Sequence, residues 1–217
     1  MAAMDQKDDA KRALRRRMKE RRDQLTAGEA AAKSQEICRH ILNWEPYRRA
    51  GSILAYFPLG NEVDLRPVLR HALAAKKTVG LPRVLGERTM DFYGIQSFND
   101  LVPGPMKLME PAGHCPRLPR PSCLVLMLVP GLAFCVPGSG QGGAVSGFGR
   151  MGYGGGFYDT WLERYENCGA AACGRDRLIT CGVAYAFQMV EPSELPLERH
   201  DRLLDHIVTE NGGLAIP

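Results

Sequence analysis

Apolar residues recur at helical spacing in several stretches of the chain. The pattern predicts four helices, over residues 11–25, 27–42, 65–75 and 157–167. Leu14, Met18 and Leu25 share one face of the first helix, because they are separated by four and seven residues. Thr26 and Glu29 form a capping-box pattern that marks the start of the second helix. Asp64 stands where the third helix needs an N-cap.

Shorter apolar runs between these helices indicate strands. They cover residues 52–57, 78–81, 90–95, 123–129, 178–185 and 206–209. The run 123–129 is apolar throughout, which is typical of a central strand covered on both faces. Residues 101–122 are rich in Pro and Gly and predict a long ordered loop. The alternation of strands and helices predicts a single α/β domain over residues 1–217, with three layers and a mainly parallel, Rossmann-like sheet.

Two loops follow strand ends at which open α/β sheets bind ligands. They are residues 57–62 and 129–134, and both would face one crevice beyond the carboxyl ends of the strands. Glu62 could accept N–H donors of a flat heterocycle there. A turn acid in water is the plainer alternative for Glu62, and simple chain reversal is the alternative for the Pro130-Gly131 turn.

The run from Arg150 to Asp159 is the strongest local signal of chemistry. Its glycines precede a helical pattern, and free N–H groups at a helix start bind anions. We expect a nucleotide-phosphate site, with Asp159 holding a cation that bridges to phosphate. A glycine-rich hairpin without a ligand is the alternative. The run is not a dinucleotide fingerprint, because no strand is expected to lead into it.

The basic charge of the chain is concentrated in its first helix. The net charge is +4, and residues 11–22 alone hold eight Lys or Arg against one Glu, so the remainder is net negative. Lys11, Arg15 and Arg22 border the apolar face, and Lys11 and Arg15 could be fixed at a phosphate site. A solvated basic face is the alternative, and we expect it for Arg12, Arg16 and Arg17.

The C-terminal part of the chain contains further acidic and aromatic candidates for the site. Asp201 or Asp205 could be a second carboxylate for Mg²⁺, although capping or solvation would explain either residue. Tyr185, Phe187 and Gln188 follow a strand and could line the site, with core packing as the alternative, above all for Phe187.

Composition narrows the remaining choices. Hydrophobic residues make up 45% and charged residues 24% of 217 residues, as in ordinary globular proteins, and no apolar stretch is long enough for a membrane span. Seven irregularly spaced cysteines predict reduced thiols. We expect a cytoplasmic monomer that acts on small molecules and binds neither nucleic acid nor membrane.

Residues 136–149 are close to low complexity in sequence, and we expect this segment to be mobile without a ligand.

Taken together, these segments resemble the 5-formyltetrahydrofolate cyclo-ligase family. The resemblance covers nearly the whole chain, and the element 152–159, Gly-Tyr-Gly-Gly-Gly-Phe-Tyr-Asp, is its most specific part. The other matching segments are 11–15, 56–64, 130–134, 185–188, 200–201 and 207–210. The resemblance implies conversion of 5-formyltetrahydrofolate to 5,10-methenyltetrahydrofolate with ATP and Mg²⁺, and release of ADP and phosphate through a phosphorylated formyl group.

The resemblance also implies residue roles. Arg150 and Tyr158 are the expected catalytic residues, Glu62 holds the pterin, and Asp159 and Asp201 are the metal acids. The residues implied for ATP are Lys11, Arg15, Arg150, Gly152, Tyr153, Gly154, Gly155, Gly156, Phe157 and Tyr158. Those from Tyr153 to Phe157 are shared with the folate.

Two departures from the family pattern leave alternatives open. Cys135 stands where members usually have an acid, and a glycine-rich insertion precedes Arg150. If the missing acid positions Arg150, the protein would be a weak or inactive folate or nucleotide binder. A module that binds RNA or a membrane surface through the basic helix is a third interpretation; its membrane form requires exposed Leu14 and Met18.

Overall fold

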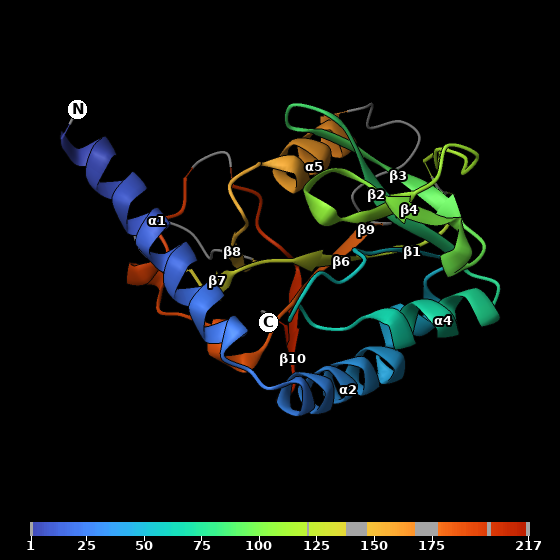
Figure 1. Ribbon diagram of the computed structural model, residues 1–217, viewed down its shortest axis with the longest axis horizontal. Helices are drawn as coiled ribbons and strands as arrows, with labels where there is room; N and C mark the ends of the chain where they lie inside the picture. The colour runs from blue at the N-terminus through green and yellow to red at the C-terminus, as the bar shows by residue number, and fades with distance from the viewer. Residues whose placement is uncertain (1, 121, 138–146, 168–177, 199–200, 216–217) are drawn as a thin grey trace.

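A sheet of seven strands forms the centre of the protein (Figure 1). The computed structural model describes residues 2–120, 122–137, 147–167, 178–198 and 201–215. The strand order is β11-β10-β9-β6-β1-β2-β3. The strands are β1 (Ser52–Leu54), β2 (Thr78–Gly86), β3 (Thr89–Ile95), β6 (Val125–Pro130), β9 (Leu178–Val183), β10 (His206–Thr209) and β11 (Gly212–Ala215).

The inner part of this sheet is parallel. Strands β10, β9, β6, β1 and β2 pair in parallel, whereas β11 and β3 join the two edges in antiparallel fashion. The expected α/β class with a mainly parallel sheet is therefore confirmed. The two antiparallel edges arise from hairpins, which need only short turns.

Strand β6 is buried on both faces, as its unbroken apolar run predicts. Leu126 and Leu128 pack into one core cluster, and Val125, Met127 and Val129 pack into another on the opposite face. Successive side chains of a strand point to opposite faces, so one apolar run serves both clusters.

Helices cover the two faces. Helices α2 (Ala27–Asn43), α3 (Glu45–Arg49) and α4 (Arg66–Ala74) lie on one side of the sheet, and α5 (Phe157–Asn167) lies on the other (Figure 1). The capping box predicted for α2 is confirmed: Thr26 Oγ1 accepts from Glu29 N, and the Glu29 carboxylate accepts from Thr26 N.

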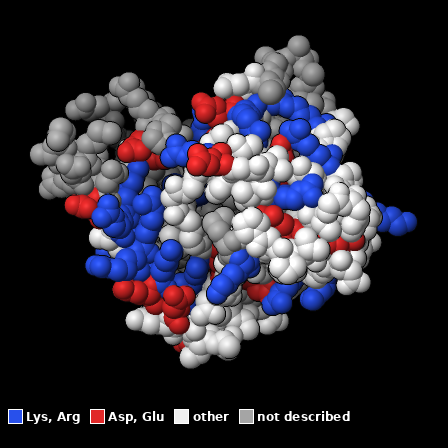
Figure 2. All heavy atoms as spheres, turned by 45° about the horizontal axis from the view of Figure 1, so that its top comes forward, with Lys and Arg blue, Asp and Glu red and all other residues white. Residues whose placement is uncertain are grey.

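Helix α1 (Ala2–Asp23) lies outside these layers, along one flank of the molecule (Figure 1). It packs on a two-stranded ribbon of β7 (Ala133–Cys135) and β8 (Gly149–Met151), where Leu14 and Met18 join a third core cluster. Their burial contradicts the membrane-surface interpretation, which needed both residues exposed. Lys and Arg side chains gather along this flank (Figure 2).

Several expected boundaries differ from those observed. Helix α1 begins at Ala2 rather than near residue 11, since alanines and acidic residues favour helix starts without any apolar stripe. It ends at Asp23, so Leu25 lies beyond it. The N-cap of α4 is Leu65, and Asp64 instead accepts from Arg66 N in the preceding turn.

The sequence also missed short elements. The expected loop over 101–122 contains a ribbon of β4 (Leu101–Pro103) and β5 (Met109–Pro111). Helix α3, strand β11 and the β7–β8 ribbon were not expected either. The 3₁₀ turns are η1 (Phe98–Asp100), η2 (Pro105–Lys107), η4 (Ala186–Gln188) and η5 (Pro192–Glu194). Elements of three to five residues carry too few positions for a periodic signal.

Two expectations about the chain concern its thiols and its relation to membranes. The five cysteines in the described part, Cys38, Cys115, Cys123, Cys135 and Cys181, are all free. No helix among the described residues has the length and apolar character needed to span a membrane. The mobility expected for residues 136–149 concerns a segment of which 138–146 lie outside the described residues.

Candidate active site

The glycine run connects β8 to the first turn of α5, as the sequence predicts for a helix start. Gly154 and Gly156 have φ of 106° and 66°, a region that L side chains rarely adopt. The short strand β8 leads directly into the glycines, which corrects the expectation that no strand precedes them. Among the described residues that strand pairs with β7 and not with the main sheet, so it does not form a dinucleotide-binding unit there.

Arg150 and Asp159 hold the two ends of this loop together. Arg150 Nη2 lies 2.8 Å from Asp159 Oδ2, and the arginine side chain is 5% exposed. Arg150 Nη1 also donates to the Pro130 carbonyl oxygen at 3.5 Å. The glycine loop therefore lies against the turn that follows β6, one of the two strand exits expected to form the crevice.

Helix α1 reaches the glycine loop through its basic side chains. Arg15 Nε donates to the Gly152 carbonyl oxygen at 3.2 Å. Lys11 is 12% exposed and lies 3.1 Å from the Glu198 carboxylate and 3.9 Å from Asp201. Lys11 and Arg15 are thus held against the protein body.

The three other arginines expected to be solvated divide into two kinds. Arg12 and Arg16 are about four-fifths exposed, at 80% and 79%. Arg17 is also exposed, at 49%, although its Nη2 lies 2.6 Å from Glu194. A half-exposed pair of this kind contributes little to stability, but it fixes the side chain on the surface.

Glu62 joins the loop after β1 to the glycine run. Its Oε1 accepts a hydrogen bond from the Tyr153 hydroxyl, its Oε2 accepts from Leu59 N at 3.0 Å, and its side chain is 11% exposed. Arg22 donates to the same Tyr153 oxygen and lies 3.6 Å from Glu62. The Glu62 carboxylate is therefore a partly buried hydrogen-bond acceptor at the predicted strand exit. The alternative, a solvated acid in a turn, is contradicted by this burial.

Burial controls the ionisation of the two tyrosines of the loop. Burial raises the pKa of Tyr153, and the neighbouring Glu62 carboxylate raises it further, while Arg22 opposes this. Burial also raises the pKa of Tyr158, although Arg150 opposes it. Both hydroxyls stay protonated at neutral pH, so they can donate hydrogen bonds but cannot act as bases.

The two candidate metal acids differ in their surroundings. Asp159 binds Arg150 through Oδ2 and accepts from Arg202 N through Oδ1 at 3.3 Å. Asp201 Oδ2 accepts from Glu198 N at 2.8 Å. A carboxylate has about four lone-pair positions. Asp159 therefore retains acceptor capacity and fits one oxygen ligand of a cation.

Neither acid belongs to a complete protein metal cage. Within the described ranges, Asp100, His114 and Cys115 form the only group of three or more potential ligands whose atoms lie within 4.8 Å of one another. Mg²⁺ commonly uses one or two carboxylates and completes its shell with phosphate oxygens and water. The donor set around the loop fits that mode and not a closed protein site.

The remaining C-terminal candidates have structural partners. Asp205 accepts from both the backbone N and the hydroxyl of Thr180, so it connects β9 to the segment before β10. Tyr185 is fully buried in the core, whereas Phe187 is half-buried beneath Arg21. Core packing was expected above all for Phe187, and it is Tyr185 that shows it more strongly.

Cys135 is buried in the third core cluster, opposite Gly149. A Cβ on Gly149 would lie 2.9 Å from the cysteine sulfur, which shows how closely the ribbon packs there. Burial raises the pKa of the Cys135 thiol. Arg150 forms its ion pair with Asp159. The guanidinium charge of Arg150 is therefore paired even though Cys135 replaces an acid.

Two residues near the loop gave no sufficient signal in the sequence. Arg22 is 9% exposed and lies between Tyr153 and Glu62, although its sequence position only borders the apolar face. Arg88 occupies the β2–β3 turn with a φ of 54°, and its Nε would lie 3.9 Å from a Cβ on Gly156. Only the tertiary structure brings this hairpin turn to the loop.

The comparison with protein families covers all of these segments. The family described as the 5-formyltetrahydrofolate cyclo-ligase family matches residues 7–210, from α1 to the residue after β10. The chain belongs to this family. The match therefore includes α1 from residue 7 on, the loop that carries Glu62, the glycine run and the C-terminal acids.

Curated members of the family align along most of the chain. A probable 5-formyltetrahydrofolate cyclo-ligase of Schizosaccharomyces pombe is 24% identical over 182 residues, which is 82% of this chain and 84% of the relative. The 5-formyltetrahydrofolate cyclo-ligase of Haemophilus influenzae is 28% identical over 193 residues, covering 87% of this chain and 91% of the relative.

Solved structures of the family share the architecture. The NMR structure of Aquifex aeolicus 5,10-methenyltetrahydrofolate synthetase has a TM-score of 0.73 and 27% identity, and the alignment covers 94% of this chain and 92% of that one. A 5,10-methenyltetrahydrofolate synthetase from Mycoplasma pneumoniae has a TM-score of 0.67 at 19% identity, covering 92% and 98%. The second similarity bears on the fold alone.

Proposed function

We propose that this protein is a 5-formyltetrahydrofolate cyclo-ligase, which closes 5-formyltetrahydrofolate to 5,10-methenyltetrahydrofolate at the expense of ATP. Residues 1–217 act as one domain in this proposal, as a cytoplasmic monomer. The substrates are two small molecules, a reduced folate and a nucleotide.

One observation carries the proposal beyond family membership. Three segments far apart in sequence contact the same glycine loop: α1 through Arg15, the loop after β1 through Glu62, and the turn after β6 through Pro130. They bring cations, a carboxylate acceptor and main-chain groups to the first turn of α5. This combination supports joint binding of a phosphate chain and a flat heterocycle.

The proposed reaction has two steps. The formyl oxygen attacks the terminal phosphorus of ATP, the bond to the bridging oxygen breaks, and ADP leaves. N10 of the folate then attacks the formyl carbon, loses its proton, and phosphate leaves as the C–O bond breaks. A formyl oxygen is a poor leaving group until it carries phosphate, so the first step makes the second one feasible.

The chain's own groups mainly position the reactants and neutralise charge. Lys11, Arg15 and the main chain from Gly152 to Tyr158 hold the phosphates in this proposal. Arg150 faces the transferred phosphate, and Asp159 keeps its guanidinium oriented. Tyr158 stays protonated and donates a hydrogen bond to the reacting oxygens.

Glu62 is proposed to hold the folate ring. Its Oε1 already accepts from a hydroxyl, so ring N–H donors can take the place of Tyr153 at that atom. Asp159 and Asp201, which lies beside Lys11, would be the protein acids that hold a Mg²⁺ ion together with the nucleotide phosphates. When bound, Mg²⁺ supplies charge neutralisation along the phosphate chain.

One assay tests the proposal against its alternatives. Purified protein is mixed with 5-formyltetrahydrofolate, ATP and Mg²⁺, and the absorbance of the methenyl product is followed with time. Product formation that depends on all three components is expected. Absence of product with intact ATP binding would identify an inactive binder, and salt-sensitive RNA binding that folate does not alter would identify a polyanion-binding module.

A further inference from the structure

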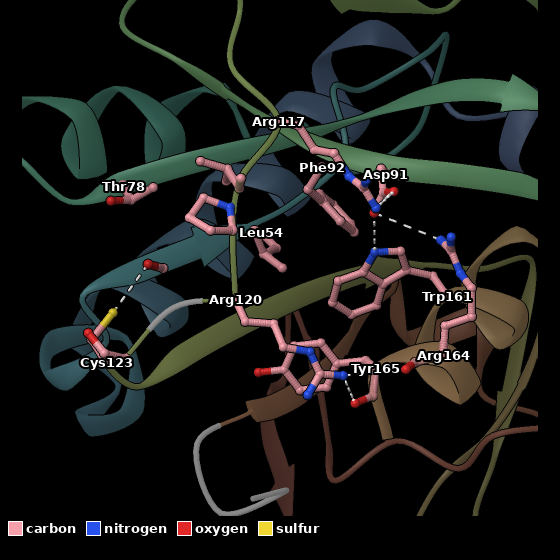
Figure 3. A pocket seen from close by; sticks show the side chains of 14 residues that line it. Leu54, Thr78, Asp91, Phe92, Arg117, Arg120, Cys123, Trp161, Arg164 and Tyr165 are labelled. Atoms are coloured by element: carbon pink, nitrogen blue, oxygen red, sulfur yellow. Dashed lines mark hydrogen bonds and ion pairs between the residues drawn. The ribbon is translucent and has the colours of Figure 1, made fainter. Parts of the chain in front are cut away.

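A second cavity lies away from the glycine loop, on the α5 face of the sheet. Its volume is about 690 Å³, within the usual range for small-ligand sites. It is bounded by Ser52 and Thr78 at the starts of β1 and β2, by α5, and by residues 117–120, 122 and 123 (Figure 3). The candidate active site lies at the opposite, carboxyl ends of these strands. The cavity therefore belongs to neither the glycine loop nor the Glu62 loop.

Positive charge exceeds negative charge at one side of this cavity. Arg117 Nη2 lies 2.5 Å from Asp91 Oδ2, and Arg164 Nη2 lies 3.8 Å from Asp91 Oδ1. Trp161 Nε1 donates to that same Oδ1 at 3.1 Å. One carboxylate thus serves two guanidinium groups and an indole, as Figure 3 shows, and it can neutralise only one of the two arginines.

Not all N–H donors of the Arg164 guanidinium group have a hydrogen-bond acceptor among the described residues. Its long contact with Asp91 is a weak one, and its remaining hydrogen bond goes from Nη2 to the Met90 carbonyl oxygen at 2.6 Å. In the described part of the chain, Arg164 Nε has no hydrogen-bond partner although it is buried. A guanidinium group has five N–H donors and binds carboxylate or phosphate through two of them at once.

The body of the cavity is apolar and aromatic. Trp161 and Tyr165 stack at 5.0 Å with an interplanar angle of 25°, and Phe92 meets Trp161 edge-on at 5.1 Å. Leu54 and Leu118 complete this wall. Rings pack well against flat partners, and an apolar wall disfavours a fully hydrated inorganic ion.

We propose that this cavity is a second ligand site, which binds a flat aromatic molecule bearing one carboxylate or phosphate group. The ring lies along the wall of Phe92, Trp161 and Leu118. The anionic group meets the guanidinium groups of Arg117 and Arg164. This site is independent of the proposed cyclo-ligase function, because none of these residues contacts the glycine loop in the contacts described above.

The test uses 1-naphthoate as the probe, titrated into the full-length protein. The chain has two tryptophans, so the variant Trp44→Phe leaves Trp161 as the only indole reporter. We expect saturable quenching of Trp161 fluorescence, confirmed by calorimetry. Two control ligands should each bind at least about tenfold more weakly. The uncharged 1-naphthalenemethanol lacks the carboxylate that meets the arginines, and acetate lacks the ring that packs on the aromatic wall.

Variants then locate the bound probe. Arg164→Gln and the more exposed Arg117→Gln should each weaken 1-naphthoate binding by roughly tenfold or more, as expected for loss of a charged hydrogen-bond donor. Arg39→Gln, on α2 beneath the other face of the sheet, should leave it unchanged. Arg117 is 63% exposed and Asp91 keeps its contacts with Arg164 and Trp161 when Arg117 is replaced, so the Arg117 variant stays informative if Arg164→Gln does not fold.

Two results would overturn the assignment. One is binding of 1-naphthoate that both arginine variants leave unchanged. The other is competition by saturating ATP that removes the Trp161 signal in step with ATP occupancy, which would assign the probe to the glycine loop.

Discussion

Arg15 and Arg16 are neighbours in sequence with different surroundings. Arg15 points to the glycine loop and donates to the Gly152 carbonyl oxygen, whereas Arg16 is 79% exposed and lies 4.0 Å from Glu20. Helical geometry turns consecutive residues by about 100°, so one borders the buried face and the other does not. The role of a basic residue in α1 therefore depends on its angle around the helix.

The first prediction concerns this difference. Arg15→Ala should lower kcat/KM for ATP by ten- to a hundredfold, because a charge-assisted contact to phosphate contributes about 1.5–3 kcal/mol. Arg16→Ala is the matched control and should change kcat/KM less than about twofold. Steady-state kinetics of both variants measure this directly. Equal values for Arg15→Ala and the unchanged protein would show that Arg15 has no contact with the nucleotide.

The second prediction concerns Asp159. Asp159→Asn keeps the size of the side chain and removes its charge, so more Mg²⁺ should be needed for half-maximal activity. Glu163→Gln makes the same change one turn later on α5, at a residue that is 58% exposed, and should leave the Mg²⁺ dependence unchanged. Activity at a series of Mg²⁺ concentrations gives the comparison. Superimposable curves for all three proteins would exclude Asp159 as a metal acid.

At the scale of elements, the site depends on a loop held in one conformation between β8 and α5. Gly154 and Gly156 have positive φ, and a Cβ on Gly155 would approach the Phe157 ring to 2.6 Å. Glycine therefore meets a conformational or steric demand at each of these positions. The structure shows the geometric demand at Gly154, Gly155 and Gly156, whereas phosphate binding by this loop stays a prediction.

The third prediction follows from this geometry. Gly156→Ala should reduce the free energy of unfolding by about 1–2 kcal/mol, the cost of a left-handed conformation for alanine, and should raise the KM for ATP. Gly28→Ala in α2 is the control: it meets no atom within 4 Å, and alanine favours helix, so about 0.5–1 kcal/mol of added stability is expected. Urea unfolding measures both. A Gly156 variant as stable as the unchanged protein would show that the loop tolerates another conformation.

At the scale of the whole molecule, β10 connects the C-terminal part of the chain to the helices beneath the sheet. His206 at the start of β10 meets Trp44 edge-on at 4.8 Å, at the junction of α2 and α3. Burial lowers the pKa of His206 below its usual 6.5, and Asp205 only partly opposes this. The folded protein therefore favours the neutral form of His206 more than the unfolded chain does.

The fourth prediction is a loss of stability on acidification. Because the folded pKa is below the unfolded value, this contribution is fully present above the unfolded pKa of 6.5. It decreases as the pH falls through 6.5 towards the folded pKa, where the unfolded chain binds the extra proton. His206→Gln should remove part of the decrease in melting temperature between pH 7.5 and 5.5. The same decrease in both proteins would contradict the proposed cause.

The sequence predicted the fold best where long segments obey one pattern. The apolar run of β6 requires burial on both faces, and the capping box of α2 requires a helix start at that position. Both requirements depend on residues close together in the chain, and both predictions are confirmed. Asp64 shows the limit of this approach, since an acid before a helix can serve the cap or the preceding turn equally well. Its position in sequence does not distinguish the two.

For the site, the sequence identified the glycine run, Lys11, Arg15 and Glu62 as candidates. The structure brings these segments together, since Arg15 contacts Gly152 and Glu62 contacts Tyr153, and joint binding of nucleotide and folate there stays a prediction. Arg22 and Arg88 were not among these candidates. The position of Arg22 at the border of the apolar face does not reveal its partners, and an arginine in a hairpin turn looks like an ordinary surface residue until its neighbours are known.

The sequence by itself determined the α/β class, the buried central strand and the glycine loop at a helix start. Each of these depends on periodicity or on residues adjacent in the chain, and such interactions are local. Only the tertiary structure decided that α1 lies against the β7–β8 ribbon, that Asp159 rather than an acid at position 135 holds Arg150, and that Arg117 and Arg164 share Asp91. Those pairings join residues far apart along the chain, and their distances are fixed by packing of the whole core.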